Sequence, residues 1–163
     1  MPTQAAGIVL FRMAEGDGGR ADLEVLIAHM GGPFWSNKDE RAWSIPKGEI
    51  EPEETPEQAA RREFEEELGS APPDGPLVLL GDFPQSRKNV TVFALEGDLD
   101  ARAIVSNEFE MEWPRGSGRR RSFPELDRAE WVGTDLARVK LVKGQVPIVE
   151  ALRALVDQGR IGS

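Results

Sequence analysis

The stretch from Gly48 to Ser70, GEIEPEETPEQAARREFEEELGS, constrains the fold of this chain more than any other. Its 23 residues include nine glutamates and two arginines, and therefore carry seven of the nine net negative charges of the chain. Thr55 can cap a helix and can form a capping box with Gln58. Pro56 suits the first turn of that helix, and Gly69 suits its end. The sequence therefore predicts a helix between Thr55 and Gly69.

The predicted helix has an apolar row beside an acidic one. At about 100° per residue, Ala60, Phe64 and Leu68 form one row that must face a core. Three carboxylates lie side by side on the flank of that row, those of Glu63, Glu66 and Glu67. The helix therefore brings three negative charges together near its C-terminus.

Acidic side chains destabilise a helix at this end. Each costs about 0.3–1 kcal/mol against the helix dipole, and like charges three or four residues apart repel one another. A charge run usually marks a solvated face, and that alternative applies to any glutamate-rich helix. The fixed arrangement of cap, apolar row and acids instead favours a bound divalent cation. We expect Mg²⁺ or Mn²⁺, which take oxygen ligands from carboxylates, water and phosphates.

The spacing of these residues resembles the Nudix box, the signature of the Nudix hydrolases. The resemblance covers 23 of 163 residues and includes Phe64. Every charged and glycine position is filled, by Gly48, Glu54, Arg62, Glu63, Glu66, Glu67 and Gly69. One position departs, because Ser70 stands where a bulky aliphatic residue is usual. That position packs rather than reacts. The resemblance implies an α/β fold, an α/β/α sandwich around a mixed β-sheet.

The same resemblance implies roles for the residues of the box. Glu63 and Glu67 are implied as metal ligands, and the Gly48 carbonyl contributes an oxygen. Glu66 is implied as a third ligand or a proton acceptor.

Arg62 and Glu54 resemble the pair that holds the loop of the box against its helix. The alternative is a surface ion pair, which would contribute less than about 1 kcal/mol.

A fourth acid from outside the box often completes such sites in this family. The segment 107–113 alternates strictly and puts Glu108, Glu110 and Glu112 on one side of a predicted strand. A solvated strand face would give the same pattern. Of the three we choose Glu110 as a metal ligand.

Basic groups are needed to meet the phosphates of a substrate. The loop GSGRRRS offers Arg119, Arg120 and Arg121, whose guanidinium groups suit phosphate oxygens, although surface ion pairs would explain them equally well. Lys47 directly precedes the box. The stretch WSIPKGE around it resembles Nudix members that hydrolyse diadenosine or diphosphoinositol polyphosphates.

Aromatic residues could stack against a base, but most aromatic side chains lie in cores. We expect Phe34 and Trp35, in a loop before the box, to contact substrate rather than Trp43, Trp113 or Trp131. His29 is the only histidine, and we expect a structural role for it. A single histidine also excludes a histidine-rich zinc site.

The bulk composition limits the remaining possibilities. With 163 residues, 39% of them hydrophobic, we expect a single domain over residues 1–163. Neither a long apolar run nor a signal peptide occurs, so we expect no membrane partner. The absence of cysteine excludes disulfides and thiolate chemistry, and fits a cytoplasmic protein. A net charge of −9 disfavours binding to nucleic-acid duplexes.

Strand patterns surround the helix. We predict a hairpin from residues 4–12 and 22–30 around the loop EGDGGR, then strands at 77–83, 89–95, 107–113 and 130–132. Residues 114–121 are predicted as a connection without a strand, and helices close the chain, with Gly159 as the last stop.

The sequence thus predicts a metal-dependent pyrophosphohydrolase. Water would attack phosphorus and split a phosphoanhydride in a nucleoside or dinucleoside polyphosphate, a small-molecule substrate. Two alternatives remain: a catalytically idle Nudix domain that senses a ligand or partner, and a structural protein stabilised by calcium or magnesium. The base, the number of metals and a possible homodimer are left open.

Overall fold

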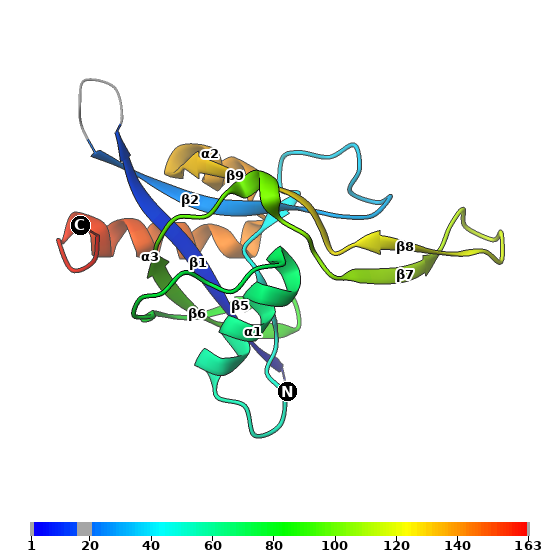
Figure 1. Ribbon diagram of the computed structural model, residues 1–163, viewed down its shortest axis with the longest axis horizontal. Coiled ribbons are helices and arrows are strands. Elements are labelled where there is room, and N and C mark those ends of the chain that lie inside the picture. Colours follow the sequence, from blue (N-terminus) through cyan, green and yellow to red (C-terminus); the bar gives the residue numbers. More distant parts are fainter. Residues whose placement is uncertain (1, 16–20, 163) are drawn as a thin grey trace.

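A mixed sheet forms the centre of the part of the chain that this computed structural model describes, residues 2–15 and 21–162 (Figure 1). Its main path runs β3-β2-β1-β6-β5, with β4 beside β1 and β9 beside β2. β1 and β6 are parallel, whereas the other pairs are antiparallel. The strands are β1 (Thr3–Glu15), β2 (Ala21–Met30), β3 (Trp43–Ser44), β4 (Lys47–Glu49), β5 (Val78–Gln85), β6 (Lys88–Glu96) and β9 (Leu126–Gly133).

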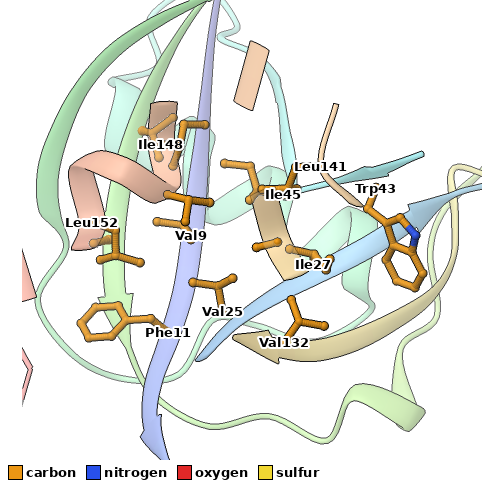
Figure 2. Packing of buried hydrophobic residues seen from close by; sticks show 14 of the residues in the cluster. Val9, Phe11, Val25, Ile27, Trp43, Ile45, Val132, Leu141, Ile148 and Leu152 are labelled. Atoms are coloured by element: carbon orange, nitrogen blue, oxygen red, sulfur yellow. The ribbon is translucent and has the colours of Figure 1, made fainter. Parts of the chain in front are cut away.

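The central strands are buried on both faces, and alternate residues enter two different hydrophobic clusters. In β1, Val9 and Phe11 join one cluster, while Ile8 and Leu10 join the other. Figure 2 shows Val9 and Phe11 beside Leu152 in the first cluster. This period of two explains why the strands read as nearly continuous apolar runs.

Helices cover both faces of the sheet. α1 (Pro56–Leu68) contributes to the cluster that contains Ile8 and Leu10. α2 (Thr134–Lys140) and α3 (Val146–Asp157) contribute to the opposite cluster. Two short 3₁₀ turns complete the set, η2 (Ala101–Ala103) and η3 (Lys143–Gln145). The predicted α/β/α sandwich with a mixed sheet is confirmed. Among the described residues, no helix combines the length and apolar composition that a membrane crossing requires.

The predicted capping of α1 is also confirmed. The Thr55 hydroxyl accepts from the Gln58 backbone N–H, and the Gln58 side chain accepts from the Thr55 N–H. Gly69 ends the helix in the left-handed conformation at φ 80°, which favours glycine. The predicted apolar row is fully buried, as Ala60, Phe64 and Leu68.

The predicted strands are confirmed, with most of the EGDGGR loop outside the described residues. One prediction was wrong, because the connection at 114–121 already enters a strand at Arg120. β7 (Glu108–Glu112) and β8 (Arg120–Pro124) form a separate two-stranded hairpin. β8 pairs only with β7 and lies outside the main sheet. It therefore does not need the alternating apolar residues by which a core strand is recognised. In Figure 1 this hairpin extends away from the rest of the molecule.

Gln145 is a fully buried polar residue that joins three segments. Its side-chain oxygen accepts from the Ile45 N–H at 2.9 Å, and its amide nitrogen donates to Ser44 Oγ at 2.8 Å. The same nitrogen donates to the side chain of Gln85 at 3.2 Å. Gln145 therefore fixes the segment that leads from β3 into Lys47.

Replacing Gln145 with leucine should destabilise the protein by about 1–3 kcal/mol, because the buried Ile45 N–H would lose its acceptor. Thermal unfolding with and without the substitution measures this. The matched control is Gln158→Leu at an exposed position after α3, where we expect a change within about 0.5 kcal/mol. Equal stability of the two variants would contradict the assigned role of Gln145.

Candidate active site

The short strand β4 places the start of the acidic stretch against the sheet. β4 pairs with β1 so that Gly48 lies opposite Ala6. The Glu63 carboxylate occupies the space beside Gly48, because a Cβ at position 48 would lie 2.1 Å from the Glu63 carboxyl carbon. The backbone of β4 and the Glu63 side chain of α1 are therefore in direct contact.

Arg62 connects the loop before α1 to the acidic side of the helix. Its guanidinium group donates to both carboxylate oxygens of Glu54, at 2.8 and 3.0 Å, and to the Glu49 carbonyl at 3.0 Å. Both side chains are largely shielded, at 25% exposure for Arg62 and 13% for Glu54. This is the bidentate geometry that distinguishes strong arginine pairs from ordinary surface ion pairs.

The pKa values follow from this pairing. Hydrogen bonds from Arg62, and then one from the Glu51 N–H, lower the pKa of Glu54 to about 2. The Glu54 hydrogen bonds in turn raise the pKa of Arg62. Arg62 also donates to the carboxylate of Glu63 at 2.8 Å and to that of Glu66 at 3.2 Å. Burial raises the pKa of Glu63, and the Arg62 hydrogen bond opposes that rise.

Glu67 is the acid of the cluster that faces a pocket. Burial raises its pKa to about 8, Lys47 opposes the rise, and the carboxylates of Glu63 and Glu125 add to it. The pocket has a volume of about 260 Å³ and is lined by Met30, Gly31, Trp35, Ser44, Lys47, Glu67, Phe109, Glu125 and Leu126. Keeping Glu67 ionised here would require more positive charge than Lys47 supplies.

The donor set suits a hard divalent cation, because it consists of carboxylate oxygens beside a backbone carbonyl. In the arrangement described, however, Glu63 and Glu66 hydrogen-bond to Arg62 instead of converging on Glu67. Within residues 2–15 and 21–162, no three acidic or histidine side chains form a group that could hold an ion. Binding would therefore require Glu63 or Glu66 to turn from Arg62 towards Glu67.

Glu125 is a site residue that the sequence reasoning missed. It follows β8, and two backbone hydrogen bonds fix its position. The Glu125 N–H donates to the Asn107 carbonyl at 2.9 Å, and the Glu125 carbonyl accepts from the Gly31 N–H at 2.9 Å. The available signal was an acid placed between two strands, in FPELD, without any alternation to mark it. The pocket thus brings a fourth acid from outside the box close to Glu67.

Glu110, the fourth acid chosen from the sequence, lies elsewhere. Phe109 of β7 lines the pocket, so its neighbour Glu110 points from the other face of the same strand. The alternation predicted for 107–113 is present, with exposed glutamates and partly buried apolar residues. Metal ligation by Glu110 stays a prediction, and this arrangement does not support it.

The predicted substrate contacts separate into two groups. Lys47 and Trp35 line the pocket. Phe34 is 61% exposed, packs edge-on against Trp35 with ring centroids 4.9 Å apart, and is covered by the Lys38 ammonium at 3.4 Å. The second group does not line the pocket but lies on the β7–β8 hairpin, and it consists of Arg119, Arg120 and Arg121.

A second pocket of about 280 Å³ adjoins the first, because Met30, Ser44 and Lys47 line both. It adds Lys88 and Gln85, and the Gln85 amide nitrogen is buried without a partner among the described residues. Lys47 therefore borders both cavities, and Lys88 borders the second. No periodic pattern in the sequence marked Lys88, which is the first residue of β6 after the turn that follows β5.

His29 has the structural role expected for it. It is fully buried and bonds Asp127 at 2.9 Å and the Lys38 carbonyl at 2.6 Å. Trp43 is also buried, in the cluster covered by α2 and α3, and its ring NH donates to Asp39 at 2.9 Å. Neither residue is available to a ligand.

Similarity to known proteins agrees with this geometry. The NUDIX domain family matches residues 1–152. A 64-residue segment is 42% identical to the RNA pyrophosphohydrolase of Alkalilimnicola ehrlichii, covering 38% of this chain and 35% of that protein. A 68-residue segment is 38% identical to the RNA pyrophosphohydrolase of Vibrio atlanticus, covering 40% of each. The similarity thus spans well under half the length of these relatives.

Solved structures share the fold. The C. elegans Ap4A hydrolase binary complex superposes with a TM-score of 0.60 and 19% identity, over 96% of this chain and 98% of that one. The NUDIX domain of Shewanella oneidensis NrtR, complexed with ADP ribose, gives 0.61 and 17%, over 96% and 89%. At such identities the likeness concerns the fold alone. Since the family match spans nearly the whole sequence, however, the chain belongs to the Nudix family.

Proposed function

We propose that this protein is a divalent-metal-dependent pyrophosphohydrolase that cleaves a phosphoanhydride bond in a nucleoside or dinucleoside polyphosphate. One observation carries the proposal: Glu67, with its raised pKa, shares a pocket with Glu125 and Lys47 at the acidic side of α1. The names of the relatives, RNA pyrophosphohydrolase and Ap4A hydrolase, support the same reaction class.

The acids of the Nudix box would hold the metal. Glu63, Glu66 and Glu67 offer carboxylates and Gly48 a carbonyl, a set that favours Mg²⁺ or Mn²⁺. When bound, such an ion neutralises phosphate charge and lowers the pKa of a coordinated water.

The other residues would position the substrate. Lys47 and Lys88 border adjoining pockets, so their ammonium groups can pair with successive phosphates. Trp35 and Phe109 line the first pocket and offer ring faces to a base. Glu125 lines the same pocket as Glu67, and we assign it as a candidate acceptor for the proton of the attacking water.

A catalytically idle Nudix domain that binds a nucleotide is the second candidate. The hydrogen bonds from Arg62 to Glu63 and Glu66 favour it, because they leave these acids turned away from Glu67. The presence of every acid of the box argues against it, since an idle site has no need of the full set.

Location and assembly stay proposals. The absence of cysteine fits a cytoplasmic protein, and the sequence leaves open whether the chain forms a homodimer.

Removing single charges from the acidic side of α1 tests the assignment. Glu66→Gln and Glu67→Gln should each lower kcat with a nucleoside triphosphate or a dinucleoside polyphosphate by about a hundredfold or more. Steady-state kinetics with millimolar magnesium, with products identified by mass, measures this.

The matched control is Glu65→Gln, which removes the same charge from the exposed neighbour of Glu66. We expect activity close to that of the unchanged protein. If Glu65→Gln and Glu67→Gln lose activity equally, or if neither loses any, the site is assigned wrongly.

Stability without metal should fall as pH rises. Glu67 keeps its proton up to about pH 8 when folded, whereas the unfolded chain releases it near 4.5. Its contribution is therefore complete below pH 4.5 and is lost as pH approaches 8. Between pH 6 and 8 this amounts to about 2–3 kcal/mol, or a Tm lower by about 5–10 °C.

Thermal unfolding in EDTA measures this slope. In Glu67→Gln the additional loss between pH 6 and 8 should disappear, while Glu65→Gln should follow the unchanged protein. Adding magnesium should raise the Tm more at pH 8 than at pH 6, since the ion replaces the proton. A slope that survives in Glu67→Gln would show that another group titrates.

A further inference from the structure

His29, the only histidine of the chain, lies with both ring nitrogens against oxygen atoms. Its Nδ1 is 2.9 Å from the Asp127 carboxylate, and its Nε2 is 2.6 Å from the Lys38 carbonyl. The His29 side chain is fully buried, so water cannot replace either partner. Each of the two contacts therefore needs a proton between its nitrogen and its oxygen.

The partners do not supply these protons. A backbone carbonyl only accepts, so the contact with Lys38 requires a proton on Nε2. The Asp127 oxygen that meets Nδ1 also accepts from Arg128 at 3.2 Å, which favours an ionised carboxylate there. A neutral imidazole has one N–H, whereas an imidazolium has two. The hydrogen-bond network thus assigns a proton to both ring nitrogens.

The surroundings of the ring compensate a buried positive charge. Asp127 supplies the opposite charge in direct contact, as a buried ion requires. On the other side, the Trp43 ring meets the His29 ring edge-on, with centroids 5.2 Å apart. The remaining charged groups on the neighbouring elements have contacts of their own, Arg128 with Asp127, Lys140 with Asp39 and Glu130, and the Lys38 ammonium with the Phe34 ring.

The two acceptors belong to different walls of the first pocket. The Lys38 N–H donates to the Trp35 carbonyl at 2.9 Å, and Trp35 lines the pocket. Asp127 lies two residues after Glu125, which lines the same pocket. His29 therefore joins the loop that carries Trp35 to the segment that carries Glu125.

Of these two walls, the loop depends more on His29. Glu125 is also fixed by two backbone hydrogen bonds of its own. In the loop, the Lys38 carbonyl is bonded to His29, and Asp39 makes the next side-chain contact with the sheet one residue further from Trp35. Loss of the Nε2 proton would place a lone pair against the Lys38 carbonyl and displace the loop.

We propose that His29, as an imidazolium, is a positioning residue that fixes Trp35 at the pocket for the base of the substrate. It does not touch the substrate, because it is fully buried and acts through the Lys38 carbonyl. This inference rests on the proposed function for the role of Trp35. Since the acids of α1 are not involved, the effect falls on KM rather than on kcat.

The single histidine makes the ring signals unambiguous. In 15N spectra of the full chain at pH 7, both ring nitrogens should have the chemical shift of protonated nitrogens. In Asp127→Asn the new amide can donate to Nδ1, so we expect one protonated and one unprotonated nitrogen. The matched control is Asp135→Asn, which removes the same charge from a fully exposed position on α2 and should leave both protons in place.

Two outcomes of these spectra would overturn the proposal. The first is an unprotonated ring nitrogen in the unchanged protein. The second is a ring that keeps both protons in Asp127→Asn. Both measurements use proteins with an intact His29, so they decide even if replacement of His29 prevents folding.

Exchanging donors and acceptors tests the positioning role. The amide of His29→Gln has one NH2 group and one oxygen, so its oxygen faces one of the two acceptors. KM for ATP should rise about fivefold or more, the low end for one base–aromatic stack, with kcat within about twofold. Adding Asp127→Asn gives that oxygen a donor and should restore most of the lost KM.

Such a rescue distinguishes hydrogen bonding from packing, because the double variant has the same altered volume as His29→Gln. Thermal unfolding checks that both variants are folded. A fall in kcat at unchanged KM would contradict the positioning role. A KM in the double variant as high as in His29→Gln would contradict it too.

A signal from Trp35 separates this inference from the proposed function, because it requires no turnover. The Trp35 indole N–H, assigned with Trp35→Phe, should shift in His29→Gln and return in the double variant, while that of Trp113 should not move. If neither ATP nor a dinucleoside polyphosphate is hydrolysed, the proposed function fails and the Trp35 signal still decides on His29. If ATP is hydrolysed and the Trp35 signal does not shift in His29→Gln, only the positioning role fails.

Discussion

The guanidinium group of Arg62 is the contact on which the acidic side of the structure depends. Three glutamates near the C-terminus of α1 oppose the helix dipole and repel one another. Arg62 offsets this repulsion from within the same helix, because it donates hydrogen bonds to Glu63 and Glu66. It also donates to Glu54 and to the Glu49 carbonyl. This one side chain thereby connects the acidic side of α1 to the segment that precedes the helix. A lysine could not reproduce this, since it lacks the planar fork that meets both oxygens of Glu54.

The sheet supplies the rigidity that such a charged site needs. β1 is buried on both faces and carries β4 at its edge, so Gly48 is positioned by backbone pairing rather than by a flexible loop. From the other side, Gln145 holds the residues that precede Lys47. The acids on α1 and the ammonium of Lys47 thus belong to two different anchored segments, which meet only at the pocket.

The sequence was sufficient wherever a residue's partners lie close along the chain. The ends of α1 are marked in the sequence by Thr55, Gln58 and Gly69, which form local hydrogen bonds at the helix termini. Apolar runs likewise predict the strands. It was insufficient for Glu125 and Lys88, which reach the pockets through sheet register and turn geometry. The choice of Glu110 shows the same limit: its alternation correctly indicated a strand, yet the face that meets the pocket belongs to Phe109. Nothing in GSGRRRS indicated that neighbouring arginines would stand on opposite faces.

Lys47 borders two adjoining cavities, and this sharing has a consequence for the proposed reaction. A chain of phosphates that passes from one cavity to the other must run past a single ammonium group. In the proposed reaction, cleavage would leave one anionic fragment beside Lys47 and the other in the cavity that Lys88 also lines, and the two fragments would repel each other. The fragment that departs first leaves the remaining one more firmly held. For the proposed reaction, an asymmetric order of release would follow from two cavities that share Lys47 while only one of them is lined by Lys88.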